Sequence, residues 1–163
     1  MTEDYFEKEQ DYTLLKGKYI DLQANYCQTS YTSRLYLKYL YDNKNSIINS
    51  NPYKNRYNYN NDVFIHVRLG DVVNKNPGLK YYTNVLESIH FDKGYISSDS
   101  IDHSICKELI AKYNLTVIIL DEIQTIQFAS TCKYIILSNG TFSWMIGSMG
   151  FFSKVWYPKV KKH

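Results

Sequence analysis

Four short apolar runs, each followed by polar residues, dominate the chain from residue 62 onward. They are Val63–Val67, Gly94–Ile96, Leu115–Leu120 and Tyr134–Leu137. Three of the four are rich in Val and Ile, which is typical of strands buried on both faces of a parallel sheet. A fifth run, Lys154–Tyr157, ends at Pro158 and predicts a strand at the edge of the sheet.

Between these runs lie segments whose apolar residues recur with helical spacing. The clearest is Leu79–Ile89, and similar spacing predicts helices over Ile101–Tyr113, Ile123–Cys132 and Phe142–Met149. Strands that alternate with helices predict an α/β fold: a Rossmann-like open parallel sheet with helices on both faces.

The first third of the chain has a different pattern. Tyr19–Leu22 predicts a strand and Ser30–Tyr41 a helix, whereas Asn43–Asn61 is rich in Asn and Tyr and is expected to be a linker or exposed loop. We therefore expect an N-terminal segment over residues 1–61 and a Rossmann-like domain over residues 62–163.

Composition and charge narrow the function classes. The 163 residues are 44% hydrophobic and carry a net charge of +3 without a long basic stripe, so we expect no nucleic-acid partner. The basic residues near the C-terminus, Lys159 to Lys162, are expected to form a solvated end.

Three cysteines, Cys27, Cys106 and Cys132, are widely spaced, which predicts reduced thiols and neither a disulfide framework nor a zinc site. The N-terminus is polar and no apolar stretch is long enough to cross a membrane. The expectation is a cytoplasmic protein without a membrane partner.

Polar side chains follow each predicted strand. Arg68 and Asp71 follow the first, Asp99 the second, Asp121 the third and Asn139 the fourth. Ligands of open α/β sheets bind outside the carboxyl ends of the strands, so these groups are candidates for one site. Ordinary polar loops would give the same pattern, and both interpretations stand at this point.

The segment Asn139–Trp144 predicts a tight turn at Gly140 followed by a helix that Thr141 or Ser143 would cap. The N-terminus of a helix offers N–H groups and a partial positive charge to a phosphate. An ordinary capped helix is the alternative.

The segment HVRLGD, His66–Asp71, contributes the cationic group. Strand alternation places His66 and Arg68 on one side, and Arg68 at the strand end would reach a diphosphate with its planar fork. A simple ion pair between Arg68 and Asp71 is the structural alternative. His66 is expected to be either a core histidine or a general base, and Asp71 is a second candidate base.

These segments resemble the motifs of a known family. HVRLGD resembles the His-x-Arg-Arg-Gly-Asp motif of the alpha-1,2-fucosyltransferases, and the stretch from Ile136 to Trp144 resembles their Asn-Ser-Thr-Phe-Ser-Trp-Trp segment. The strand end at Asp99 is similar to their Phe-Ser-Asp-Asp segment. Asp121 with the stretch from Phe128 to Lys133 is similar to their Asp-x-x-x-Met-Ser-x-Cys-Lys stretch.

The resemblance implies the C-terminal, nucleotide-sugar-binding half of a GT-B glycosyltransferase. Such an enzyme would transfer fucose from GDP-fucose to a glycan acceptor by an inverting mechanism without a metal or other cofactor. Arg68 would neutralise the leaving diphosphate, and Asp99 would contact guanine or ribose. The other donor-binding candidates are Asp121, Asn139, Thr141, Phe142 and Ser143.

The chain departs from the family pattern at Leu69, which replaces the second motif arginine, and at Met145, which replaces the second tryptophan. Only about sixty residues precede the first motif, and Gln23 or Gln28 would represent a family glutamine. The alternative to an active transferase is therefore a nucleotide-sugar-binding module that is non-catalytic or depends on a partner chain. Another transferase of nucleoside-diphosphate sugars is a third interpretation.

Overall fold

The computed structural model describes residues 30–159, and these fall into two compact units that divide after Ile47. The first unit contains α3, Ser30–Asp42, where the sequence predicted a helix. The predicted strand Tyr19–Leu22, as well as Gln23, Gln28 and Cys27, lie outside the described residues. No described helix has the length and apolar character required to cross a membrane.

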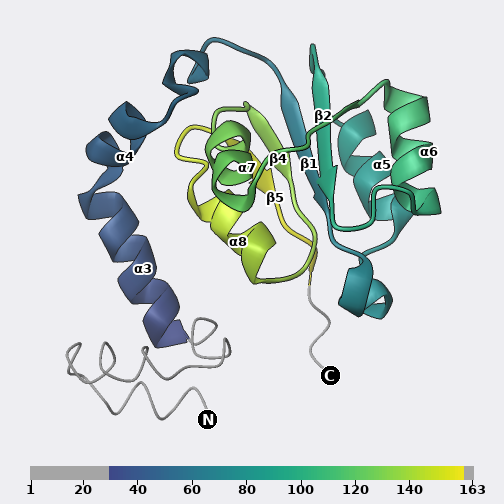
Figure 1. Cartoon of the computed structure of the whole chain (residues 1–163), viewed down its shortest axis with the longest axis horizontal. Helices are drawn as coiled ribbons and strands as arrows, with labels where there is room; N and C mark the ends of the chain where they lie inside the picture. The colour runs from purple at the N-terminus through teal and green to yellow at the C-terminus, as the bar shows by residue number, and fades with distance from the viewer. Residues whose placement is uncertain (1–29, 160–163) are drawn as a thin grey trace. The chain divides into compact units, whose positions relative to one another are not determined.

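The second unit is built on a five-stranded parallel sheet of order β3-β2-β1-β4-β5 (Figure 1). Its strands are β1 (Val63–Val67), β2 (Gly94–Ser98), β3 (Thr116–Val117), β4 (Tyr134–Ile136) and β5 (Lys154–Trp156). In the register, Ile65 lies opposite Ile96 on one side and Ile136 on the other. The predicted Rossmann-like fold is confirmed, and β5 is the expected edge strand.

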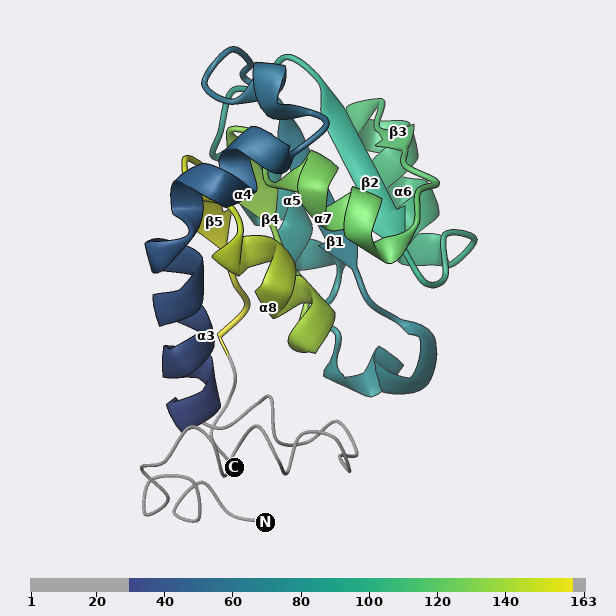
Figure 2. The same cartoon turned by 60° about the vertical axis from the view of Figure 1, so that its left-hand side comes forward.

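Two pairs of helices cover opposite faces of the sheet (Figures 1 and 2). On one face pack α5 (Leu79–Glu87) and α6 (Ser104–Tyr113), and on the other pack α7 (Glu122–Ala129) and α8 (Thr141–Ser148). Their bounds agree with the predicted helices to within three residues at each end.

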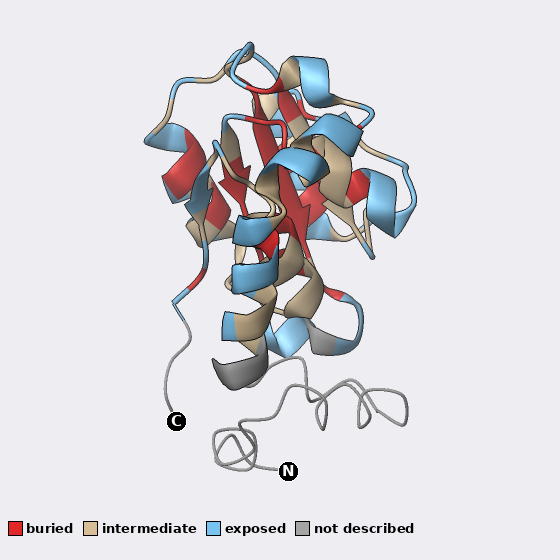
Figure 3. Ribbon diagram, turned by 90° about the vertical axis from the view of Figure 1, so that its left-hand side faces the viewer, coloured by how far each residue is buried: buried red, intermediate tan, exposed pale blue. Residues whose placement is uncertain are grey.

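The central strand β1 is buried along its whole length, and buried residues gather in the middle of the domain (Figure 3). Val63, Ile65 and Val67 join the core beneath α5 and α6. Phe64 joins the core beneath α7 and α8, because successive side chains of a strand point to opposite faces. The apolar side chains of β1 therefore contribute to the hydrophobic cores on both faces of the sheet.

The third predicted strand is much shorter than expected. Of Leu115–Leu120, only Thr116 and Val117 form β3, and Ile119 is 90% exposed. As an edge strand, β3 pairs only with β2, so its apolar run lacks the two-sided burial that the composition suggested. An apolar run by itself does not distinguish a central strand from an edge strand.

The Asn-rich stretch is also different from the prediction. Instead of an exposed loop, it contains α4 (Lys44–Ser50) and the 3₁₀ turn η2 (Lys54–Arg56). Asn51 is buried and donates from its side-chain amide to the hydroxyl of Tyr57 and to the backbone oxygen of Gln127. The residues after Ile47 therefore belong to the sheet domain.

Arg56 fastens this segment to the amino-terminal edge of the sheet. Its guanidinium pairs with Asp62 at 2.9 Å, donates to the hydroxyl of Thr131 at 3.0 Å and lies over the ring of Phe128. Asp62 is 4% exposed and directly precedes β1. A buried carboxylate requires such a partner, so Arg56 stabilises the entry into the central strand.

We expect Arg56→Ala to lower the free energy of unfolding by about 2–3 kcal/mol, somewhat less than the loss of one member of a fully buried ion pair, since Arg56 is partly exposed. Denaturant unfolding measures the change. Lys54→Ala, in the same turn but exposed, is the control and should stay within about 0.5 kcal/mol of wild type. Equal stabilities of all three proteins would contradict a structural role for this segment.

Candidate functional site

The order of the strands marks one place on the carboxyl edge of the sheet. After β1 the chain adds β2 and β3 on one side, and then crosses to add β4 and β5 on the other. The carboxyl ends of β1 and β4 therefore flank the point where the strand order reverses. In open α/β sheets this switch point is the preferred place for a ligand.

Arg68 and Gly140 meet at this point. Arg68 follows β1, and Gly140 is the residue before α8. A Cβ atom placed on Gly140 would lie 2.7 Å from Nη1 of Arg68 and 3.3 Å from its Cδ, so the arginine lies directly against the glycine backbone. The guanidinium therefore lies beside the N-terminus of α8. The hypothesis that this site binds a phosphate depends on that proximity.

The short turn η3, Gly70–Lys75, follows Arg68 and carries Asp71. Nη2 of Arg68 donates to both carboxylate oxygens of Asp71, at 3.0 and 3.2 Å. This hydrogen bond lowers the pKa of Asp71, whose side chain remains 73% exposed. The ion pair considered as a structural alternative is thus present, and it leaves Nη1 directed toward Gly140.

Two asparagines, one of them absent from the sequence-based candidates, hold the backbone around Arg68. Asn76 donates to the carbonyl oxygen of Arg68 at 2.8 Å and accepts from the N–H of Gly78. Asn139 donates to the carbonyl oxygen of Lys75. The sequence NPG at Asn76–Gly78 is a turn signal that predicts such an Asn side-chain bond, although it does not identify Arg68 as its partner.

His66 lies on the same face of β1 as Arg68, as the alternation predicted. It is 5% exposed, hydrogen-bonded through Nδ1 to the hydroxyl of Ser143 in α8, and in edge contact with the ring of Phe142. Burial lowers the pKa of His66 to about 4, with Arg68 adding to the decrease and Asp99 opposing it. The imidazole is therefore neutral at pH 7 and ties β1 to α8.

The carboxylates of Asp99 and Asp121 each accept from a backbone N–H. Asp99 accepts from the N–H of Leu69 at 2.9 Å, so its carboxylate braces the end of β1. Asp121 is the N-cap residue of α7 and accepts from the N–H of Gln124. It follows β3, which is separated from β1 by β2, and the structure does not bring it to Arg68.

The predicted capping of α8 by Thr141 or Ser143 is wrong. The N-cap residue is Gly140, which has no side chain, with φ of 114° and ψ of 162°. Ser143 is fully buried and bonds His66 instead. A glycine fits here because the positive φ and the adjacent arginine both disfavour a Cβ atom.

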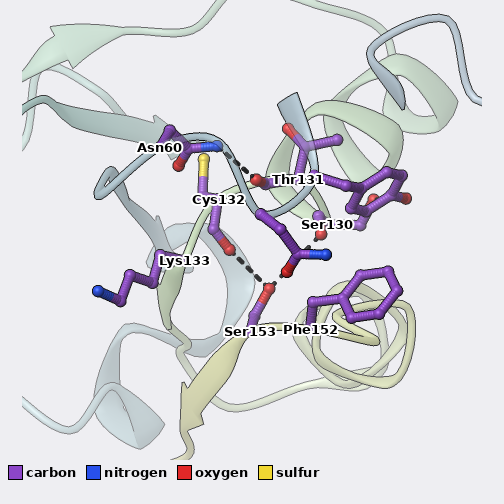
Figure 4. Close-up of a pocket in the computed structure, with 9 residues that line it drawn as sticks. Asn60, Ser130, Thr131, Cys132, Lys133, Phe152 and Ser153 are labelled. Carbon is purple, nitrogen blue, oxygen red and sulfur yellow. Dashed lines mark hydrogen bonds between the residues drawn. The ribbon is translucent and has the colours of Figure 1, made fainter. Parts of the chain in front are cut away.

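A cavity of about 190 Å³ lies at the opposite, amino-terminal edge of the sheet (Figure 4). It is lined by Tyr57, Asn58, Asn60, residues 130–133, Phe152 and Ser153. Several of its polar groups are bonded to one another: Asn60 donates to the backbone oxygen of Thr131, and Ser153 donates to the backbone oxygen of Cys132. We assign the candidate site to the carboxyl edge because the cationic group and the helix N-terminus meet there.

Within residues 30–159, no group of three or more His, Cys, Asp or Glu side chains is arranged to hold a metal ion. The described cysteines, Cys106 and Cys132, are buried thiols. No protein-family model, curated protein or solved structure matches this chain. The comparisons therefore leave the fold and the site geometry as the basis for a functional argument.

The pKa of His66 predicts how stability depends on pH. Below pH 6.5 the unfolded chain binds a proton at this histidine, whereas the folded chain does not until about pH 4. Stability is therefore lost as pH falls through this window, by about 2 kcal/mol between pH 7 and pH 5 from this group alone.

Denaturant unfolding of wild type and His66→Gln at pH 7, 6 and 5 measures this contribution. The variant should be less stable at pH 7 but should lose less stability on acidification. His90→Gln, at an exposed position, is the control and should retain the wild-type pH dependence. An unchanged slope in His66→Gln would contradict a buried, neutral His66.

Proposed function

We propose that this chain binds a nucleoside-diphosphate sugar at the carboxyl edge of its sheet and acts as a glycosyltransferase that uses GDP-fucose. The contact of Arg68 with Gly140 at the start of α8 is the observation that carries the proposal. It combines a planar cationic donor with the N–H groups of a helix N-terminus, both suited to a diphosphate. The motif resemblance to fucosyltransferases supplies the donor sugar and base.

The proposed chemistry centres on the leaving group. When the bond between the sugar and the diphosphate breaks, negative charge develops on the diphosphate. The guanidinium of Arg68 and the dipole of α8 would stabilise that charge without a metal ion. The family's second arginine is here Leu69, which is 1% exposed and packed in the core beneath α5 and α6, so Arg68 would act without a neighbouring guanidinium in the motif.

A nucleotide-sugar-binding module without catalysis of its own is the second candidate function. This second function is favoured because both candidate general bases, His66 and Asp71, already have partners in the structure. His66 is buried and bonded to Ser143, and Asp71 is paired with Arg68, which lowers the pKa of its carboxyl and makes it a weaker base. Release of GDP from GDP-fucose, measured with and without glycan acceptors, separates an enzyme from such a module.

We expect Arg68→Ala to weaken GDP binding by at least about tenfold, since a hydrogen bond between charged groups contributes about 1.5–3 kcal/mol. Isothermal titration and the GDP-dependent rise in melting temperature measure the loss. Lys93→Ala, which removes one positive charge before β2 at the opposite edge of the sheet, is the control and should bind as wild type does. If Arg68→Ala retains wild-type affinity, the site assignment is wrong.

Two glycines provide a matched test of the close contact between Arg68 and Gly140. Gly78 and Gly140 are both N-cap residues with positive φ and extended ψ, a region that only glycine adopts readily. A Cβ atom at Gly78 would have no neighbour within 4 Å, whereas one at Gly140 would meet Arg68.

Both alanine variants should therefore lose about 1–3 kcal/mol of stability from backbone strain. Only Gly140→Ala should also weaken GDP binding, because it must displace the guanidinium. Unfolding and GDP titrations of the two proteins, carried out below their melting temperatures, measure the two effects. Equal GDP affinities would argue against the contact between Arg68 and Gly140 as the phosphate site.

A further inference from the structure

The short turn η3 provides the hydrogen-bond acceptors for two side chains at the switch point, Arg68 and Asn139. The carboxylate of Asp71 accepts from Arg68, and the carbonyl oxygen of Lys75 accepts from the side-chain amide of Asn139. Asp71 and Lys75 both belong to η3, Gly70–Lys75. Arg68 and Asn139 follow the two strands that flank the switch point. Each of the two acceptors is an oxygen, the kind of atom that a phosphate would present.

The arrangement leaves one polar atom beside it without a partner. Oδ1 of Asn139 is buried and has no hydrogen-bond partner within residues 30–159. Buried polar atoms are usually paired, so this oxygen indicates that one hydrogen bond of the site is still to be formed. Because an amide oxygen only accepts, a sugar hydroxyl, a water molecule or a donor brought in by movement of η3 would complete it.

The ends of η3 are fixed while its middle is exposed. Before it, the N–H of Leu69 is bonded to Asp99, and a Cβ atom on Gly70 would meet the same carboxylate at 2.8 Å. After it, Asn76 is bonded to the backbone of Arg68 and Gly78. Between these anchors the side chain of Asp71 is 73% exposed. Movement of η3 would therefore be confined to about six residues.

We propose that η3 is an autoinhibitory strap: Asp71 and the Lys75 carbonyl occupy donors of the phosphate site and must be displaced when the diphosphate of the sugar nucleotide binds. The inference rests on the proposed function, and it adds a regulation of the same site. The strap is displaceable because the Asp71 carboxylate is 73% exposed, and ion pairs with a solvent-exposed partner contribute little stability. A second negative charge beside the bound diphosphate would also oppose binding.

Asp71→Asn tests the proposal because it removes the charge and keeps the size of the side chain. We expect it to bind GDP and inorganic pyrophosphate about two- to fivefold more tightly than wild type, in line with the strength of an exposed ion pair. Without ligand, amide hydrogen exchange over residues 70–75 should be faster than in wild type. In wild type, saturating GDP should speed exchange over the same residues.

Glu87→Gln is the matched control. Glu87 also forms an exposed ion pair, with Lys112 at 2.7 Å, and the substitution changes the net charge by the same amount. It should leave both GDP affinity and the exchange of residues 70–75 at wild-type values. An equal gain in affinity in Glu87→Gln would assign the effect to net charge and overturn the proposal.

Two further results separate the strap from the proposed function. Unchanged exchange over residues 70–75 in Asp71→Asn overturns the strap whether or not GDP binds, and so does weaker or equal binding of pyrophosphate by this variant. If pyrophosphate binds more tightly to Asp71→Asn while no protein binds GDP, the strap is supported and the assignment of GDP-fucose as donor fails.

Discussion

The burial of β1 on both faces is the constraint on which the sheet domain depends. The strand β1 lies between β2 and β4, and helices cover it on both faces. Each of its side chains must therefore pack against the helices of one face or the other. Val63, Ile65 and Val67 pack under α5 and α6, so Phe64 and His66 must face α7 and α8. The next residue in that series, Arg68, emerges at the carboxyl edge on the side of α8.

Two arginines at opposite edges of the sheet have different roles in the structure. Arg56 lies at the amino edge, where Asp62, Thr131 and the ring of Phe128 bind its guanidinium. Arg68 lies at the carboxyl edge, where Nη2 pairs with the exposed Asp71 and Nη1 lies against the backbone of Gly140. In our proposal, Arg56 is structural because protein groups satisfy its charge, and Arg68 binds a ligand because its acceptor is accessible to solvent.

The site combines rigid and adjustable parts. The bond of His66 to Ser143 fixes the end of β1 relative to α8, and the bond of Asp99 to the N–H of Leu69 fixes it relative to the end of β2. Asp71 and η3 lie outside this frame, where solvent weakens their interactions. A frame that positions a cation, with the exposed Asp71 beside it, would suit the anionic ligand that we propose.

The sequence by itself determined the order of strands and helices, because burial on two faces and helical spacing leave local patterns in the residues. It also determined that His66 and Arg68 share a side of their strand, since alternation is local. It did not determine that Leu115–Leu120 would lie at an edge, or that the Asn-rich stretch would pack through Asn51, Tyr57 and Arg56.

Only the tertiary structure decided which strand ends meet, because the crossover that places β4 beside β1 joins residues more than seventy positions apart. It brought Arg68 to Gly140 and left Asp121 at a distant strand, although the sequence ranked both as site residues. Polar residues after a strand look alike in sequence, and the packing of the sheet selects those that can act together.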